Sequence, residues 1–211
     1  MDVLKTVCGG LCGAVGCVVG VGCAVAPIVL TVYQGIYAFN NPDNEAWLGV
    51  TPGGENKLFV DEQAGNLDRA TGLVDIHGRF VTWFLWGFLT SLSPLVMGLL
   101  FLMATVINPN LGGFCGALNA CTIGCSGLAW WITGIVWRFR SDGAFVSGDL
   151  VPEGKTQEEW LETVTAEDSL YQYKSGHFMA IYYFICFAIV GFGCLTSGVG
   201  AVYACLTASK G

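Results

Sequence analysis

Residues 80–137 have the sequence FVTWFLWGFLTSLSPLVMGLLFLMATVINPNLGGFCGALNACTIGCSGLAWWITGIVW, a run of 58 residues without Asp, Glu, Lys, Arg or His. The hydrocarbon core of a bilayer is about 30 Å thick and takes roughly 20 apolar residues per helix, so this run predicts two membrane spans. Asn108 and Pro109, followed by paired glycines, predict a tight connection, because proline interrupts helices while amides and glycines favour turns. We therefore expect a helical hairpin in a membrane.

The composition of the whole chain agrees with this interpretation. Hydrophobic residues make up 54% of the 211 residues and charged residues 12%, about half the charged share of a soluble domain. With a further uncharged stretch on each side of the hairpin, the sequence predicts an all-α integral membrane protein, multi-pass, folded as one domain of four transmembrane helices in a bundle. The expected spans are residues 7–34, 80–107, 113–137 and 176–206, and the polar loops are residues 41–79 and 138–175.

The first stretch also resembles a cleavable signal peptide, with Ala24-Val25-Ala26 as the cleavage site. Pro27 would follow the cut, which favours a retained span. Orientation is less clear. Arg79, Arg138, Arg140 and Lys174 favour cytoplasmic loops under the positive-inside rule, whereas Lys5, before the first span, favours the opposite.

Acidic residues are concentrated in the two loops. Fifteen of the sixteen Asp and Glu residues lie there, and each loop carries a net charge of −4. This distribution argues against a nucleic-acid partner and against an anionic lipid surface. It would suit a basic partner, although a simply solvated loop has the same composition. Both loops are expected on one side of the membrane.

Three of the four spans contain small residues at helical spacing. Small residues let transmembrane helices approach closely, so these rows predict tight helix packing. The predicted packing positions are Gly9, Gly13, Gly16 and Gly20 in the first span, Gly112, Gly116 and Gly124 in the third, and Gly193, Ser197 and Ala201 in the fourth.

The second span is bulky, and its aromatic first turns predict a lipid-facing helix. Pro94 should kink it near mid-membrane, with the hydroxyls of Ser91 and Ser93 able to bond the freed carbonyls. Indole rings prefer the headgroup level, and Arg138 and Arg140 should mark the emergence of the third span into water. The predicted interfacial belt consists of Trp83, Trp86, Trp130, Trp131 and Trp137.

Local signals in the loops predict three further elements. Thr156 and Glu159 match a capping box, so we expect a short amphipathic helix over 157–165 with Trp160, Leu161 and Val164 on one face. Residues 165–168 look like the start of the fourth helix, and residues 58–60 like a short strand. The first loop has too few apolar residues to fold alone and is expected to pack on the second.

No catalytic residues, metal site or cofactor are predicted, and a bound lipid is the one small molecule that the composition suggests. The ten cysteines all lie in apolar runs, where they can act as small packing residues. Two alternatives stay open: acylation of Cys8, Cys12 and Cys205, and a soft-metal or disulfide role for cysteines such as Cys121 and Cys125. His77 and His177, each close to acidic residues, are the other metal candidates.

The motif WWITGIVW at residues 130–137 resembles an uncharacterised family of small four-span (tetraspan) membrane proteins of protists and animals. The resemblance implies a four-span topology and no activity. The sequence therefore favours a non-enzymatic structural protein whose partners are membrane lipid and further copies of the chain or another membrane protein. Two alternatives remain: a subunit of a homo-oligomeric channel, and an accessory subunit of a larger membrane complex.

Overall fold

A computed structural model describes residues 25–50, 54–60 and 72–208. For Thr122, Phe192 and residues 194–208 it describes the backbone and not the side chains. In this part of the chain, three helices are long and apolar enough to cross a membrane: α3, α4 and the first part of α7. A shorter apolar helix, Val25–Phe39, covers the end of the predicted first span. Most of that span lies outside the described residues. The helical membrane class predicted from the sequence is supported.

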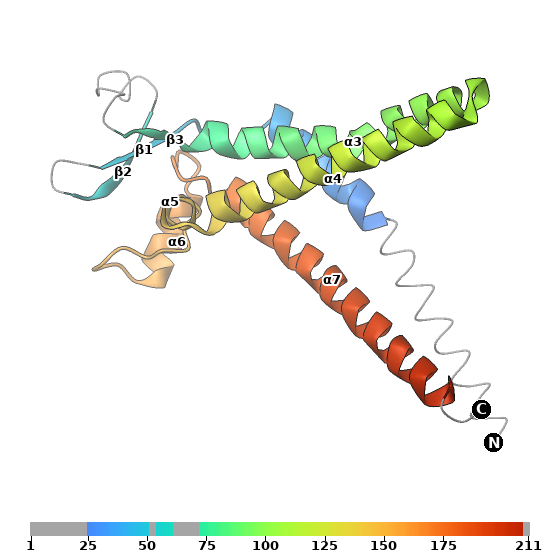
Figure 1. The fold of residues 1–211 in the computed structure, drawn as a ribbon. Coiled ribbons are helices and arrows are strands. Elements are labelled where there is room, and N and C mark those ends of the chain that lie inside the picture. The colour runs from blue at the N-terminus through green and yellow to red at the C-terminus, as the bar shows by residue number, and fades with distance from the viewer. Residues whose placement is uncertain (1–24, 51–53, 61–71, 209–211) are drawn as a thin grey trace. The chain divides into compact units, whose positions relative to one another are not determined.

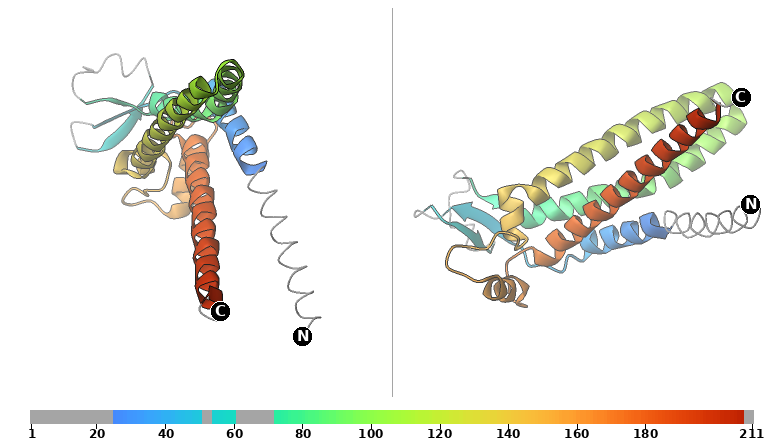
Figure 2. Two further views of the ribbon diagram at one scale, coloured as in Figure 1. Left: turned by 45° about the vertical axis from the view of Figure 1, so that its right-hand side comes forward. Right: turned by 90° about the horizontal axis from the view of Figure 1, so that it is seen from below.

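The hairpin is formed by α3 (Ile76–Ile107) and α4 (Pro109–Phe139), which run side by side (Figures 1 and 2). Asn108 alone connects them: its backbone N–H ends α3 by donating to Ala104 O, and its side chain starts α4 by accepting from Asn110 N. The connection is shorter than predicted, since Pro109 occupies the first turn of α4, where a missing N–H costs nothing. α4 therefore begins four residues before the expected start of the third span at 113, and the paired glycines lie inside the helix.

Pro94 lies inside α3, which continues through it as one helix. A proline there leaves the carbonyl of Thr90, four residues earlier, without its helical N–H. The Ser93 hydroxyl donates to this carbonyl at 2.7 Å. The predicted hydroxyl compensation is thus confirmed, and the kink stays a prediction.

The first loop forms a small antiparallel sheet in the order β2-β1-β3. The strands are β1 (Trp47–Val50), β2 (Asn56–Phe59) and β3 (Val74–Asp75). β2 confirms the strand predicted near 58–60. Asp75 then caps α3 by accepting from Gly78 N at 2.7 Å. Residues 76–79 are helical and lead into the second span as expected, whereas Val74 and Asp75 are strand.

The second loop carries α5 (Ser141–Val146) and α6 (Gln157–Thr165). The capping box of α6 is present as predicted, with Thr156 and Glu159 bonded in both directions. Trp160 and Val164 are buried, but Leu161 is 44% exposed, so only two of the three predicted residues face inward. α7 (Tyr173–Ala208) begins later than the predicted start at 165–168, because residues 166–172 turn back toward the first loop.

An aromatic core lies at the loop end of the hairpin, formed by Tyr37, Trp83, Phe84, Trp130 and Phe178. Trp83 and Trp130 stack with ring centroids 4.9 Å apart, and Tyr37 stacks on Phe178 at 4.8 Å. The Trp130 indole N–H donates to Trp83 O at 2.8 Å. Phe80, Trp83 and Phe84 are at most 1% exposed. The face of α3 that carries Phe80, Trp83 and Phe84 is therefore buried in protein, contrary to the expected lipid-facing surface.

Candidate functional site

The best-defined polar site is the contact between the two loops, residues 41–44 with residues 169–176, which we call the loop junction. Asp43 dominates it: its carboxylate accepts from Ser175 N at 2.7 Å and from Lys174 N at 3.3 Å. These are N–H groups of the first turn of α7, which have no partner inside their own helix. Asp43 thus caps α7 from the opposite loop, where a negative charge also suits the helix dipole.

Further hydrogen bonds surround this cap. Asn44 Nδ2 donates to Ser169 O at 2.9 Å, and Gln172 Nε2 donates to Asn44 O at 2.6 Å. The Ser175 hydroxyl donates to Asn41 Oδ1 at 3.0 Å. Gln172 and Ser175 are completely buried. The expectation that the first loop packs on the second is confirmed.

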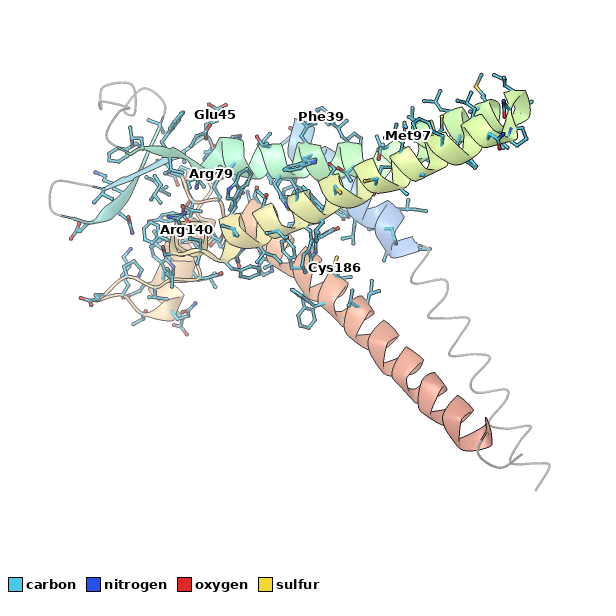
Figure 3. The ribbon with its side chains drawn as sticks, in the orientation of Figure 1. Phe39, Glu45, Arg79, Met97, Arg140 and Cys186 are labelled. Atoms are coloured by element: carbon cyan, nitrogen blue, oxygen red, sulfur yellow. The ribbon has the colours of Figure 1, made fainter. Side chains whose placement is uncertain are left out.

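Arg138 joins the end of α4 to the start of α7. Its side chain is 2% exposed, its Nη1 pairs with Asp149 at 2.6 Å, and its Nε donates to Gly176 O at 2.6 Å. The predicted emergence of Arg138 into water is therefore wrong. Arg140 is exposed, and Arg79, at the start of α3, pairs with Asp142 of α5 at 3.1 Å. The labelled Arg79 and Arg140 in Figure 3 mark this charged end of the hairpin.

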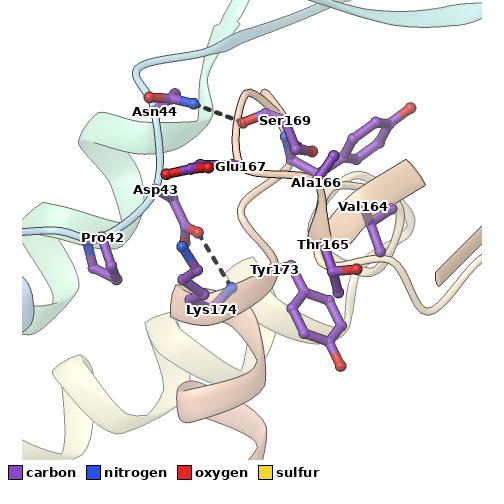
Figure 4. Close-up of a pocket in the computed structure, with 11 residues that line it drawn as sticks. Pro42, Asp43, Asn44, Val164, Thr165, Ala166, Glu167, Ser169, Tyr173 and Lys174 are labelled. Atoms are coloured by element: carbon purple, nitrogen blue, oxygen red, sulfur yellow. Dashed lines mark hydrogen bonds between the residues drawn. The ribbon is translucent and has the colours of Figure 1, made fainter. Parts of the chain in front are cut away.

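A shallow hollow of about 130 Å³ opens beside the junction (Figure 4). Asp43, Glu167 and Lys174 contribute its charged groups, and Tyr171 and Tyr173 its rings. Burial raises the pKa of the Tyr171 phenol, so this group stays neutral at physiological pH. The Asp43 carboxylate already bonds the first turn of α7. The hollow has the polarity to hold a small polar molecule, but these lining residues pair no nucleophile with a base.

The metal candidates do not come together. No group of three or more His, Cys, Asp or Glu residues in the described ranges could hold a metal ion. His177 instead stacks on Tyr173, with ring centroids 5.6 Å apart. Cys115, Cys121, Cys125 and Cys186 are thiols without a disulfide. Cys8 and Cys12 lie outside the described residues, as does the side chain of Cys205, so acylation stays a prediction.

The predicted packing glycines fall into two groups. A Cβ added to Gly112 would collide with Thr105, and one added to Gly116 would approach Phe101 to 3.0 Å, so both glycines pack within the hairpin. A Cβ on Gly124 or Gly193 would meet no atom within 4 Å. Gly9, Gly13, Gly16 and Gly20 lie outside the described residues, as do the side chains of Ser197 and Ala201.

The predicted tryptophan belt is only partly at the surface. Trp83 and Trp130 are buried and stacked on each other, so their rings cannot face headgroups as expected. Trp86 is half-buried, and its indole N–H donates to Ser126 Oγ at 2.9 Å. Trp131 and Trp137 are partly exposed, and for them the interfacial role stays a prediction.

Sequence reasoning missed the residues that organise the junction, above all Asp43 and Gln172. One signal was available for the cap: Gln172, which precedes α7, is a poor N-cap residue, so a helix beginning there needs an external acceptor. Gly87 was also missed. A Cβ there would lie 2.6 Å from the Trp130 ring and 2.9 Å from Gln34 Nε2, so only glycine fits.

The structure defines a mostly helical protein with three apolar helices of membrane-spanning length and a hydrogen-bonded loop junction, which is consistent with a membrane protein. No protein-family model, curated protein or solved structure matches the chain. The resemblance to a four-span family therefore stays a prediction.

Proposed function

We propose that the protein is a non-enzymatic structural protein of a membrane. Its four helices cross the bilayer with both acidic loops on one side, and copies of the chain associate through small-residue helix faces. The observation that carries the proposal is an exposed stripe of small residues on α4: Gly113, Ala117, Ala120 and Gly124.

This stripe differs from the small residues used inside the hairpin. Its members are spaced by four, three and four positions, which places them on one face of a helix. A Cβ on Gly113 or Gly124 would meet no atom within 4 Å, whereas Gly112 and Gly116 contact α3. Small residues offer lipid few contacts but let a second helix approach its backbone closely. The stripe therefore suits a helix of another copy.

The loop junction supports the proposed topology. It ties the segment just after the Val25–Phe39 helix to the first turn of α7 through Asp43. Arg138 ties the end of α4 to the same turn, and Arg79 ties the start of α3 to α5. The loop-side ends of the helices are thus held by one set of polar contacts, as expected if both loops lie on one side.

The test is the mass of the particle in native-like lipid discs for the wild type, Gly124→Leu and Gly98→Leu. Gly98 is the matched control, since it is an exposed glycine on α3 where an added Cβ also meets no atom within 4 Å. We expect a homogeneous oligomer for the wild type and Gly98→Leu, and loss of the oligomer in Gly124→Leu.

A monomeric wild type would overturn the proposal. Foreign chains at a fixed ratio would favour the accessory-subunit alternative. Stepwise conductance of the oligomer in planar bilayers would favour the channel. If both leucine variants keep the oligomer, the α4 stripe is not the interface.

A further inference from the structure

We propose that the α3–α4 hairpin is built for a bilayer whose hydrocarbon core is thicker than about 30 Å, so that long-chain lipids are its preferred surroundings. This inference rests on the hairpin crossing a membrane, which is part of the proposed function. It does not depend on association between copies, so a monomeric protein would overturn the proposed function and leave this inference standing.

The first argument is length. The uncharged part of α3, residues 80–107, contains 28 residues. At 1.5 Å per residue it is about 42 Å long. The uncharged part of α4, residues 109–137, contains 29 residues and is about 43 Å long. Both exceed an average hydrocarbon core by roughly 12 Å.

The second argument is that apolar side chains are exposed at both ends of this length. Near the tip, Val106 is 83% exposed and Ile107 is 77% exposed. At the loop end, α4 exposes Ile132 and Val136, each to about half of its surface. If either end left the hydrocarbon core, this apolar surface would face water, which is unfavourable in proportion to its area.

The third argument concerns tilt, the usual response of a helix that is too long. A 42 Å rod fits a 30 Å slab only at a tilt of about 45°, whereas transmembrane helices tilt by about 20° on average and up to about 40°. The two helices are packed from tip to loop end, with Gly112 against Thr105 and Gly87 against Trp130. They must therefore tilt together as one rod.

Charges fix only one end of the rod. Arg79 and Arg140, with Asp142, mark the loop end. The connection at the tip carries no charged residue, and its polar side chains are those of Asn108 and Asn110. Protein covers Phe80, Trp83 and Phe84 at the loop end of α3, so the exposed apolar length of the rod is that of α4, from Leu111 to Val136. Because the loop end is anchored by charge and the tip is apolar, a thicker core is the arrangement that covers this length.

The experiment is thermal unfolding of the purified full chain in phosphatidylcholine bilayers that differ only in acyl-chain length, from sixteen to twenty-two carbons. We expect Tm to rise across the series, by at least about 5 °C between the ends, because each ångström of mismatch carries a small cost. A maximum at sixteen or eighteen carbons would overturn the inference, since the hairpin would then tilt or leave the core.

A shortened variant tests the cause. Thr105 packs against Gly112, Phe101 against Gly116 and Gly87 against Trp130, so the facing residues of the two helices follow one register. Deleting residues 99–105 and 112–118 together removes about two turns from each helix. Because the deletions have equal length, the remaining facing pairs, such as Gly87 with Trp130, stay in register. The hairpin becomes roughly 10 Å shorter. We expect the lipid optimum to move to eighteen carbons or fewer. An unchanged optimum would overturn the inference, and if the variant does not fold, the wild-type series decides alone.

Discussion

The two ends of the α3–α4 hairpin have the same uncharged composition and opposite surroundings. At the loop end, Trp83 and Trp130 are buried, stacked and hydrogen-bonded. At the tip, Val106 and Ile107 are almost fully exposed. The difference teaches that hydrophobicity places a segment in a membrane but does not say whether protein or lipid covers it. Ring size and polar atoms decide this here, since indole N–H groups need acceptors.

The largest expected effect tests the charged boundary of the loop end. Arg138→Ala removes a side chain that is 2% exposed, together with its hydrogen bond to Gly176 O and its ion pair with Asp149. Breaking a buried ion pair costs about 3–5 kcal/mol, and because Asp149 is half exposed we expect about 2–3 kcal/mol. The measurement is the free energy of unfolding in mixed micelles. Arg140→Ala, at an exposed position, should change it by less than about 0.5 kcal/mol. Equal effects of the two variants would show that the buried contacts of Arg138 with Asp149 and Gly176 do not stabilise the fold.

The next effect compares two glycines of α3, Gly87 in the loop-end half of the helix and Gly98 in the tip half. Gly87→Ala should destabilise by about 1–3 kcal/mol, because the new methyl group collides with the Trp130 ring. Gly98→Ala, on the same helix in open surroundings, should be neutral or slightly stabilising, since alanine favours helix by up to about 1 kcal/mol. Thermal unfolding of both variants in one detergent measures the difference. A Gly87→Ala variant as stable as Gly98→Ala would show that the loop-end core is loosely packed.

A smaller effect concerns the cap that holds α7. Asp43→Ala removes the acceptor of two backbone N–H groups, and loss of an N-cap costs about 1 kcal/mol. Asp43→Asn keeps one acceptor oxygen and should lose less. Glu45→Ala, at an exposed position nearby, is the control. Hydrogen exchange at the amides of Lys174 and Ser175 should quicken most in Asp43→Ala, less in Asp43→Asn and not in Glu45→Ala. Equal exchange in all three variants would contradict the cap.

The smallest effect is a pH dependence of α6. Two hydrogen bonds from Thr156 lower the pKa of Glu159 below its ordinary value of 4.5. The bond from the Thr156 backbone N–H has the larger effect, and the bond from the Thr156 hydroxyl the smaller one. A lowered pKa means that the stabilisation is present above the ordinary value and is lost as pH falls through the folded-state pKa. NMR titration of the Glu159 carboxyl should give this lowered pKa, and Thr156→Ala should raise it. In Glu159→Gln, the acid-dependent loss of α6 helicity should disappear. A wild-type Glu159 pKa at its ordinary value would contradict this interpretation.

Features that depend on nearby residues were predictable from the sequence. The helix over 157–165 follows from the capping box of Thr156, and its bounds are those expected. The hairpin follows from the uncharged run, and the Ser93 hydroxyl bond follows from Pro94. In each case the partners lie within a few positions of one another, so the pattern contains the interaction.

Features that depend on distant partners were not predictable. Asp43 looked like one loop acid among many, because the N–H groups that donate to its carboxylate lie far along the chain, at the start of α7. Arg138 looked like a marker of the membrane boundary, because nothing nearby in the sequence shows that Gly176 and Asp149 enclose it. Trp83 and Trp130 resembled interfacial tryptophans for the same reason: a buried indole and an interfacial indole occur in similar apolar sequences.

The cap of α7 also has a consequence for the order of assembly. Asp43 and the amide of Ser175 are 132 positions apart, so the acceptor is synthesised long before the helix that needs it. The first turn of α7 can be completed only after the hairpin has been made and the first loop meets the newly emerged chain. Closing the loop junction therefore follows the synthesis of the hairpin, and it joins the segment of Asp43 to a helix made after both α3 and α4.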